Sequence, residues 1–227
     1  MCYHVKMTER LDLVAKRLGL LPPRGNHQDL FTPEMHFNGF SFPWMPILTN
    51  SDPKQMKLGK WWLMQPWQQE FDAGARNCLN TRIENVNKSH SVCNTYQNNR
   101  AVMIVDGFYE HQWQDTKGKN KRCFLMNRMK GDPFYLACLY TKWHYEDVKA
   151  EINTVTVLTR PANKLMAEIH NSKKRMPVIL DEEKAHKWLS GDLDIGFMKD
   201  GMEEYFSDYN LMYMPYDYNR PHIIRSH

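Results

Sequence analysis

The sequence predicts an α+β fold: one domain of mostly short antiparallel or mixed strands that form a barrel-like sheet, with a few flanking helices. Three observations lead to this class. Strand-like segments outnumber helix-like ones, the two kinds do not alternate regularly as βαβ folds require, and no flexible linker or internal repeat divides the chain. Because 227 residues can bury one sizeable core, we expect a single domain over residues 1–227.

Three segments have the apolar spacing and the end signals of helices. Thr8–Leu18 carries apolar residues at helical spacing and ends before a glycine. Ala162–Ile169 directly follows a proline, which favours the first turn of a helix. Glu182–Leu189 begins after Asp181, a favourable N-cap, and should end at Gly191.

Strands are expected mainly from Pro46 onward, after a loop rich in proline and glycine. Several of these segments are continuous apolar runs, as expected of strands that are buried on both faces. The predicted strands are Pro46–Thr49, Trp61–Met64, Ala101–Val105, Phe108–Gln112, Cys123–Met126, Phe134–Tyr140 and Thr154–Thr159.

The composition argues against a disordered, a membrane-spanning and a secreted protein. Hydrophobic residues make up 42% of the chain, which indicates a globular rather than a disordered protein. No apolar run approaches the ~20 residues of a membrane helix, and the first residues lack the apolar core of a signal peptide. We therefore expect a cytoplasmic protein, associated with the nucleoid if the source is bacterial. A net charge of +4 leaves nucleic-acid binding to local basic surfaces.

The cysteines are 5 in number, form no C-x-x-C pair and lack the spacing of zinc ligands, so we expect reduced thiols and no metal. One of them, Cys2, follows Met1. A side chain this small normally allows removal of the initiator methionine, which would leave an α-amine and a thiol on adjacent carbons. Because an α-amine titrates near ~8 rather than the ~10.4 of lysine, part of it is neutral and nucleophilic at neutral pH. Such an aminothiol condenses with an aldehyde to a thiazolidine; the alternative is an ordinary cysteine in a frayed terminus.

Three further segments carry residues suited to chemistry. Asn80–Glu84 offers an amide and a guanidinium that can hold phosphate or carboxylate, or it is simply a solvated loop. Asp106–Glu110 follows a buried strand, where a partly desolvated carboxylate suits acid–base work, although it could be a surface residue on an edge strand. His170 ends a helix just before the buried segment Arg175–Leu180, where it could serve a site or only cap the helix.

In this order, the segments resemble the SRAP family, the SOS-response-associated peptidase-like proteins that recognise abasic sites in single-stranded DNA. The matching positions are Met1-Cys2, Trp61 through Trp67, Asn80-x-Arg82-x-Glu84, Asp106-Gly107-Phe108-Tyr109-Glu110, Ile169-His170 and Arg175 to Leu180. The match spans residues 1 to about 189, and residues 195–227 are left unassigned.

The chain departs from the family pattern at three places. The usual Cys-Gly-Arg is Cys2-Tyr3-His4, so the early positive charge is absent. The aromatic residue that usually follows the glutamate is His111, with Trp113 two positions on. Extra residues, Asn171–Lys174, separate His170 from the arginine that follows it. These departures bear on contacts with DNA more than on the central chemistry.

The resemblance implies a covalent mechanism. The amine of Cys2, freed by removal of Met1, would attack the ring-opened aldehyde of an abasic deoxyribose, and the thiol would close a thiazolidine that protects the lesion. The resemblance assigns Asn80 to orienting the aminothiol and Arg82 to a flanking phosphate. It assigns Glu110 to proton transfer at the Cys2 amine, and His170 to opening the sugar ring.

The resemblance and the composition also suggest where DNA is bound. Trp61, Trp62 and Trp67 are candidates for stacking on bases, or else belong to the apolar core. Arg175 is expected beside Arg82 on the DNA-binding surface. The basic segment 117–122 could approach the DNA backbone, or it is an ordinary solvated turn.

Two other functions stay open. Cys2, Asn80, Glu110 and His170 could form a cysteine-nucleophile peptidase, and lyase-like or autopeptidase activity is compatible with the same groups. Alternatively, the protein only binds single-stranded DNA and Cys2 is inert. For the function that the resemblance implies, we expect no cofactor, no membrane partner, and a monomer whose partner is single-stranded DNA that contains abasic sites.

Overall fold

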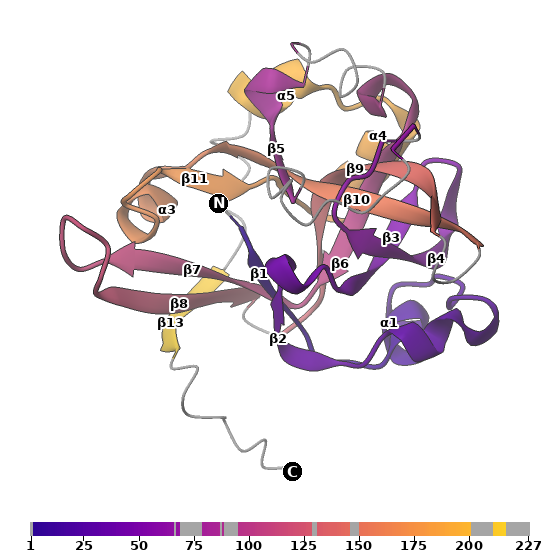
Figure 1. Ribbon diagram of the computed structural model, residues 1–227, viewed down its shortest axis with the longest axis horizontal. Coiled ribbons are helices and arrows are strands. Elements are labelled where there is room, and N and C mark those ends of the chain that lie inside the picture. Colours follow the sequence, from indigo (N-terminus) through magenta and orange to yellow (C-terminus); the bar gives the residue numbers. More distant parts are fainter. Residues whose placement is uncertain are drawn as a thin grey trace.

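Figure 1 shows the computed structural model of the protein. The structure describes residues 2–65, 67–68, 79–86, 88, 95–128, 131–145, 150–200 and 211–216. Met1, whose removal the sequence predicts, lies outside the described residues, as do residues 201–210 and 217–227 of the unassigned C-terminal segment.

Five strands of the larger sheet close on themselves. They are β3 (Trp44–Thr49), β4 (Asp52–Trp61), β6 (Arg100–Val105), β9 (Phe134–Tyr145) and β10 (Ala150–Pro161). The order β4-β3-β6-β9-β10 returns to β4 through a parallel β10–β4 pair, and the other pairs are antiparallel. Inside this closed layer a Cβ on Gly59 would lie only 2.8 Å from Ile47 and 3.0 Å from Val155. The barrel is therefore packed with side chains rather than hollow.

The second sheet is antiparallel throughout and lies beside the barrel (Figure 1). Its strands, in order, are β13 (Leu211–Tyr216), β8 (Lys121–Arg128), β7 (Gly107–Trp113), β1 (His4–Met7) and β2 (Glu34–Asn38). Three short strands extend the larger sheet: β5 (Asn80–Arg82), β11 (Arg175–Pro177) and β12 (Ile179–Leu180).

The helices are short. They are α1 (Leu11–Arg17), α3 (Lys164–Ile169), α4 (Glu182–Ser190) and α5 (Ile195–Asp200), with 3-10 turns η1 (Gly25–Leu30), η2 (Gly39–Ser41) and η4 (Ile83–Asn85). Asp181 caps α4 by accepting a hydrogen bond from the backbone N–H of Lys184 at 2.8 Å. Gly191 ends α4 with φ of 95°, which a residue with a Cβ rarely adopts.

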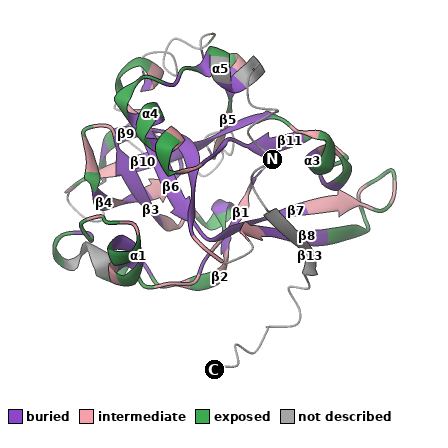
Figure 2. Cartoon of the chain, turned by 180° about the vertical axis from the view of Figure 1, so that it is seen from behind, coloured by how far each residue is buried: buried purple, intermediate pink, exposed green. Residues whose placement is uncertain are grey.

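The core fills the barrel and the space between the sheets (Figure 2). Strands β6 and β9 are buried along most of their length, as their continuous apolar runs predict. None of the helices in the described part of the chain is long and apolar enough to cross a membrane.

The predicted α+β class and barrel-like sheet are confirmed. The predicted strand Trp61–Met64 is wrong, because β4 runs from Asp52 to Trp61 and the chain then leaves the sheet. The lysines of β4 interrupt its apolar pattern, so the sequence does not predict this strand. Met64, beyond its end, is buried in irregular backbone, and its N–H donates to Thr154 Oγ1 at 3.0 Å.

Three elements near the N-terminus also differ from expectation. The short strands β1 and β2 were not predicted, because they carry mixed polar residues. Helix α1 begins at Leu11 rather than Thr8, because Asp106 takes both the backbone N–H and the hydroxyl of Thr8, at 2.8 and 2.6 Å.

Candidate functional site

The Asp-Gly pair at the start of β7 fixes the N-terminal strand in place. Buried Asp106 accepts the two hydrogen bonds from Thr8 and lies 3.4 Å from the ammonium of Lys6. Gly107 lets β1 and β8 approach closely, since a Cβ there would lie 3.1 Å from a carbonyl oxygen of β8. In the resulting register His4 pairs with Tyr109. This pairing brings the first residues of the chain beside Glu110.

Cys2 is fully buried at the beginning of this strand, with Sγ 3.9 Å from the carbonyl oxygen of His4. The next residue, Tyr3, is held by a 2.7 Å hydrogen bond from the backbone N–H of Gly39 to its carbonyl oxygen. Burial, reinforced by the negative charge of Glu110, raises the pKa of the Cys2 thiol well above its usual range. The thiol is therefore protonated at neutral pH.

Glu110 and His170 form a buried acid–base pair. The carboxylate oxygen Oε2 lies 3.9 Å from His170 Nδ1, and both side chains are less than a tenth exposed. His170 Nδ1 lies 2.7 Å from the carbonyl oxygen of Arg175 and 3.3 Å from the backbone nitrogen of the same residue. Because the contact with the acceptor is the shorter one, we assign the ring proton to Nδ1. Burial lowers the pKa of His170, and the charge of Glu110 opposes that shift. The imidazole is therefore neutral near pH 7 and can accept a proton.

Asn80 reaches the same region from the other sheet. It lies on β5, which pairs in parallel with β10, opposite Val157. Both amide atoms are buried, and neither has a hydrogen-bond partner at normal distance among the described residues. The Tyr3 hydroxyl is close enough for Asn80 to lower its pKa, although burial, the larger effect, raises it. The charges of Glu110 and Arg82 also act on the pKa of Tyr3, and Tyr3 lines the same cavity as Glu110 and His170.

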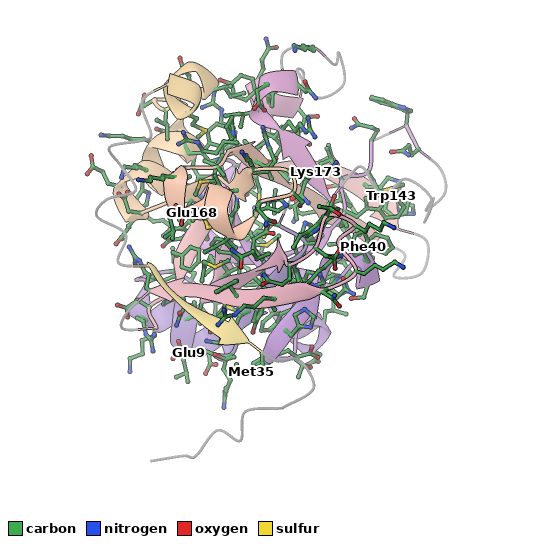
Figure 3. All side chains as sticks on the ribbon, turned by 90° about the vertical axis from the view of Figure 1, so that its left-hand side faces the viewer. Glu9, Met35, Phe40, Trp143, Glu168 and Lys173 are labelled. Carbon is green, nitrogen blue, oxygen red and sulfur yellow. The ribbon has the colours of Figure 1, made fainter. Side chains whose placement is uncertain are left out.

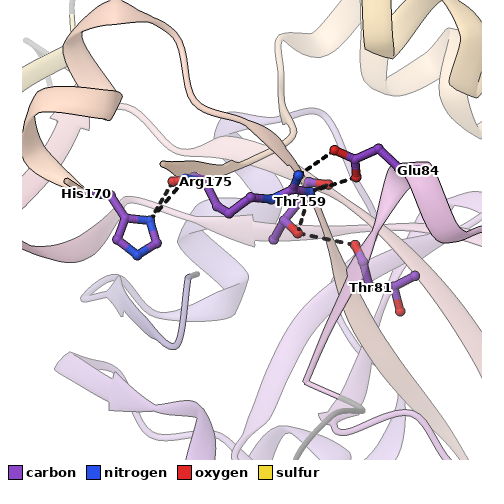
Figure 4. A network of polar contacts seen from close by, with 5 residues as sticks. All are labelled: Thr81, Glu84, Thr159, His170 and Arg175. Carbon is purple, nitrogen blue, oxygen red and sulfur yellow. Dashed lines mark hydrogen bonds and ion pairs between the residues drawn. The ribbon is translucent and has the colours of Figure 1, made fainter. Parts of the chain in front are cut away.

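Arg175 does not face solvent but contacts His170, Glu84 and Thr159 (Figure 4). Its guanidinium binds both carboxylate oxygens of Glu84 and donates to the carbonyl oxygen of Thr159 at 2.7 Å. Burial alone would raise the pKa of Glu84, but the hydrogen bonds and charge of Arg175 hold it below its ordinary value. The backbone of Arg175 orients His170, and its side chain fixes the turn that follows β5.

This arrangement corrects the expectation that Arg175 lies beside Arg82 as a DNA contact. Arg175 is only 7% exposed and its guanidinium is occupied, so it is a positioning residue. Arg82 is exposed at the end of β5, where a phosphate can reach it.

The tryptophans separate into core and surface. Trp61 is fully buried and donates from Nε1 to the carbonyl oxygen of Leu79 at 3.0 Å, so it supports Asn80 and cannot stack on DNA as expected. Trp62 is 1% exposed and stacks on Phe42 with ring centroids 4.9 Å apart, which places it in the core too. Trp67 is 68% exposed and remains a candidate for base stacking.

A cavity of about 450 Å³ opens above the buried pair. Its lining includes Glu110 and His170 at one end and side chains of the β7–β8 hairpin at the other. Figure 3 labels two more of its lining residues, Phe40 and Lys173. A cavity of about 650 Å³ along β4 and β10 contains none of the predicted site residues.

Two of the departures from the family pattern meet beside this cavity. The rings of His4 and His111 lie edge to face, with centroids 5.6 Å apart, and His36 completes a cluster by placing Nε2 2.8 Å from His4 Nδ1. Within the described part of the chain, no group of three or more His, Cys, Asp or Glu side chains could hold a metal ion. Burial lowers the pKa of all three histidines, and that of His4 falls to about 4 because His36 and His111 also oppose its charge.

This cluster predicts a loss of stability in acid. In the unfolded chain His4 titrates near ~6.5, so below that pH protons favour the unfolded state until the native pKa of about 4 is passed. The stabilisation that comes from the lowered pKa of His4 is fully present above pH ~6.5 and is lost as the pH falls toward 4. Allowing for partial exposure of the ring, we expect a loss of about 2–3 kcal/mol from His4 alone. Urea denaturation at neutral pH and at a pH near the folded-state pKa of His4 measures this loss of unfolding free energy.

The matched variants are His4→Gln, which removes the titrating group, and His186→Gln, which alters an exposed histidine of α4. The first should reduce the difference in unfolding free energy between the two pH values, and the second should not. An equal acid loss in wild type and His4→Gln would show that His4 is not its source.

The site therefore joins four sequence-predicted residues, Cys2, Asn80, Glu110 and His170, at the junction of the two sheets. Sequence reasoning missed Tyr3, which lines the cavity together with Glu110 and His170; its position next to Cys2 was the available signal. It also missed the supporting roles of Trp61 and Arg175, because burial is invisible in their motifs.

Comparisons with known proteins agree with one another. The family model described as SOS response associated peptidase (SRAP) matches residues 1–213. The abasic site processing protein YoqW of Bacillus subtilis (strain 168) is 30% identical over 212 residues, covering 88% of this chain and 91% of that protein. The abasic site processing protein HMCES of Xenopus tropicalis is 25% identical over 189 residues, covering 73% of this chain and 53% of that protein.

Solved structures have the same fold. A crystal structure of a protein from Bacteroides thetaiotaomicron has a TM-score of 0.78 at 24% identity, covering 96% of this chain and 93% of that one. One from Bordetella bronchiseptica has a TM-score of 0.73 at 18% identity, covering 95% and 100%. The family match extends beyond residue 189, where the motifs end, and includes α5 and the first residues of β13.

Proposed function

Because the chain belongs to the SOS response associated peptidase family, we propose that it processes abasic sites in single-stranded DNA. It does so by forming a covalent thiazolidine crosslink through Cys2 once Met1 has been removed. The observation that carries this proposal is the placement of Cys2 beside a buried Glu110–His170 pair, below a cavity open to solvent. The names of the relatives, abasic site processing proteins, support the same class of substrate.

The chemistry starts with the sugar. The neutral imidazole of His170 takes the proton of the anomeric hydroxyl and returns it to the ring oxygen as the ring C–O bond breaks. The products are an open aldehyde and a free hydroxyl. The low pKa of His170 supports this role, because a neutral ring can accept that proton.

The covalent steps follow at Cys2. Its α-amine adds to the aldehyde carbon, and the carbinolamine loses one water to give an imine. The thiol sulfur then bonds to the imine carbon while its proton goes to the nitrogen, which closes the thiazolidine. Glu110 carries the protons between these groups, and the raised pKa of the Cys2 thiol makes such a carrier necessary. Asn80, whose buried amide faces this region, orients the amine and the thiol.

DNA is held outside this buried centre. Arg82 is exposed at the end of β5 and binds a phosphate, for which a guanidinium fork is well suited. Trp67, with most of its ring in solvent, stacks on a base beside the lesion.

The structure offers less support to the peptidase alternative. A cysteine nucleophile works as the thiolate, and such sites lower the pKa of the thiol. Here burial and Glu110 raise that pKa. The thiazolidine route tolerates a protonated thiol, because the sulfur is needed only after the imine has formed.

One mass measurement tests the proposal. Protein without Met1, mixed with an abasic single-stranded oligonucleotide, should give a species whose mass is the sum of the two minus one water. Protein that retains Met1 should give none, because its Cys2 nitrogen is an amide. An undamaged oligonucleotide of the same sequence is the matched control. Full adduct formation by molecules that all retain Met1 would overturn the mechanism.

A further inference from the structure

The loop Asn171–Lys174, between α3 and β11, is joined to the β7–β8 hairpin. The side chain of Asn171 accepts from the backbone N–H of Trp113 at 2.9 Å and donates to its carbonyl oxygen at 2.9 Å. Gln112 adds a 2.9 Å hydrogen bond from Nε2 to the carbonyl oxygen of Glu168. These contacts satisfy the backbone at the end of β7 and hold the loop and the hairpin together at one wall of the cavity.

The hairpin presents Trp113 as a prepared aromatic surface. Gly118 lies so close to the indole that a Cβ there would be 2.6 Å from the ring, so the hairpin covers one face. The tip is ordered by Asp115, whose carboxylate accepts hydrogen bonds from the backbone N–H groups of Lys117, at 2.8 Å, and Asn120, at 2.6 Å. Trp113 also lines the cavity. An aromatic ring that is fixed from behind loses little freedom when a planar group stacks on it.

Two lysines line the cavity together with this ring. The ammonium of Lys121 lies 5.9 Å from the centroid of the Trp113 ring, and Lys173 of the loop lines the same cavity. Both lysines are exposed. Among the described residues that line the cavity, Glu110 is the one acid, and it is buried at the far end. The rim is therefore positive where a ligand would enter.

We propose that the hairpin and the loop form a subsite for the nucleotide that flanks the abasic site, with a base on Trp113 and phosphates on Lys121 and Lys173. An aromatic face next to lysines is how proteins hold single strands without reading sequence. A cavity of about 450 Å³ is large enough for one nucleotide. Its far end is the Glu110–His170 pair, so one strand can occupy both parts. The subsite rests on the proposed function.

The first test measures binding of undamaged single-stranded DNA as a function of salt. Each phosphate contact contributes a slope of about 0.7, so the double variant Lys121→Gln, Lys173→Gln should lower it by about 1.4. Trp113→Ala should weaken binding about 5- to 150-fold, the equivalent of ~1–3 kcal/mol for one stacked base, and Trp113→Phe should restore most of it. Lys54→Gln, at an exposed lysine of β4, is the control and should match wild type.

The second test locates the subsite on the strand. Oligonucleotides with the abasic site at either end lack the flank on one side. Wild type should lose affinity with only one of them, and the double lysine variant should no longer distinguish that one from a full-length strand. Lysine variants that behave like Lys54→Gln in both tests would overturn the subsite. A wild type that forms no adduct with any abasic strand would instead overturn the proposed function.

Discussion

Replacing Cys2 with alanine is expected to abolish the heat-stable DNA adduct, reducing it to the level seen with undamaged DNA. The variant keeps an α-amine after removal of Met1, so it can still form an imine with the aldehyde. It has no sulfur to close the ring, and the imine hydrolyses. Denaturing electrophoresis after heating, with and without borohydride, measures both species. Borohydride reduces the imine to a stable amine, so a trapped adduct should appear only in its presence.

The burial of Cys2 and the presence of a second buried thiol require two controls in this experiment. Cys2 is fully buried, so the melting temperature of the variant must be measured to show that the fold is retained. Cys138 is also buried and free, and lies in the barrel on β9. Cys138→Ala therefore tests whether loss of any buried thiol has the same effect, and it should crosslink like wild type. A heat-stable adduct with Cys2→Ala in the absence of reductant would rule out the thiazolidine.

The sequence predicted the barrel better than the sheet that carries Cys2. The barrel strands β6 and β9 are continuous apolar runs, a pattern typical of strands that are buried on both faces. Strand β1 is short, mixes polar and apolar residues, and is held by Asp106 from a distant part of the chain. Such a contact has no local signal in the sequence.

In the candidate site, too, some features could be predicted from the sequence and others could not. The order of the motifs predicted that Cys2, Asn80, Glu110 and His170 belong to one site, and this assignment stays a prediction. The motifs did not distinguish exposed side chains, such as Arg82, from buried ones, such as Arg175, because both kinds occur in them. Arg175 is the clearest case: it was expected on the DNA-binding surface, yet Glu84 occupies its guanidinium.

Glu110→Gln and His170→Ala are expected to slow crosslinking in different ways. In the proposed mechanism Glu110, whose charge acts on the Cys2 thiol, carries protons to and from the amine and the thiol, so Glu110→Gln should slow both formation and reversal of the adduct. The amide keeps the shape of the side chain and removes only its proton transfer. One acid–base group contributes about 10²- to 10⁴-fold, so the rate of adduct formation should fall by a factor in that range. Single-turnover kinetics with an abasic oligonucleotide measures it.

In the proposed mechanism His170 acts one step earlier, on the closed sugar. Its ring, held by the carbonyl oxygen of Arg175, would remove the anomeric proton before any bond to Cys2 forms. His170→Ala should therefore slow reaction with a natural abasic site by about 10²-fold or more. It should leave the rate almost unchanged with an analogue whose aldehyde cannot cyclise. Glu110→Gln, in contrast, should slow both substrates, because its proton transfers come after the aldehyde is open. If His170→Ala slows the two substrates equally, the histidine does not open the sugar, and its 3.9 Å approach to Glu110 must serve the later steps instead.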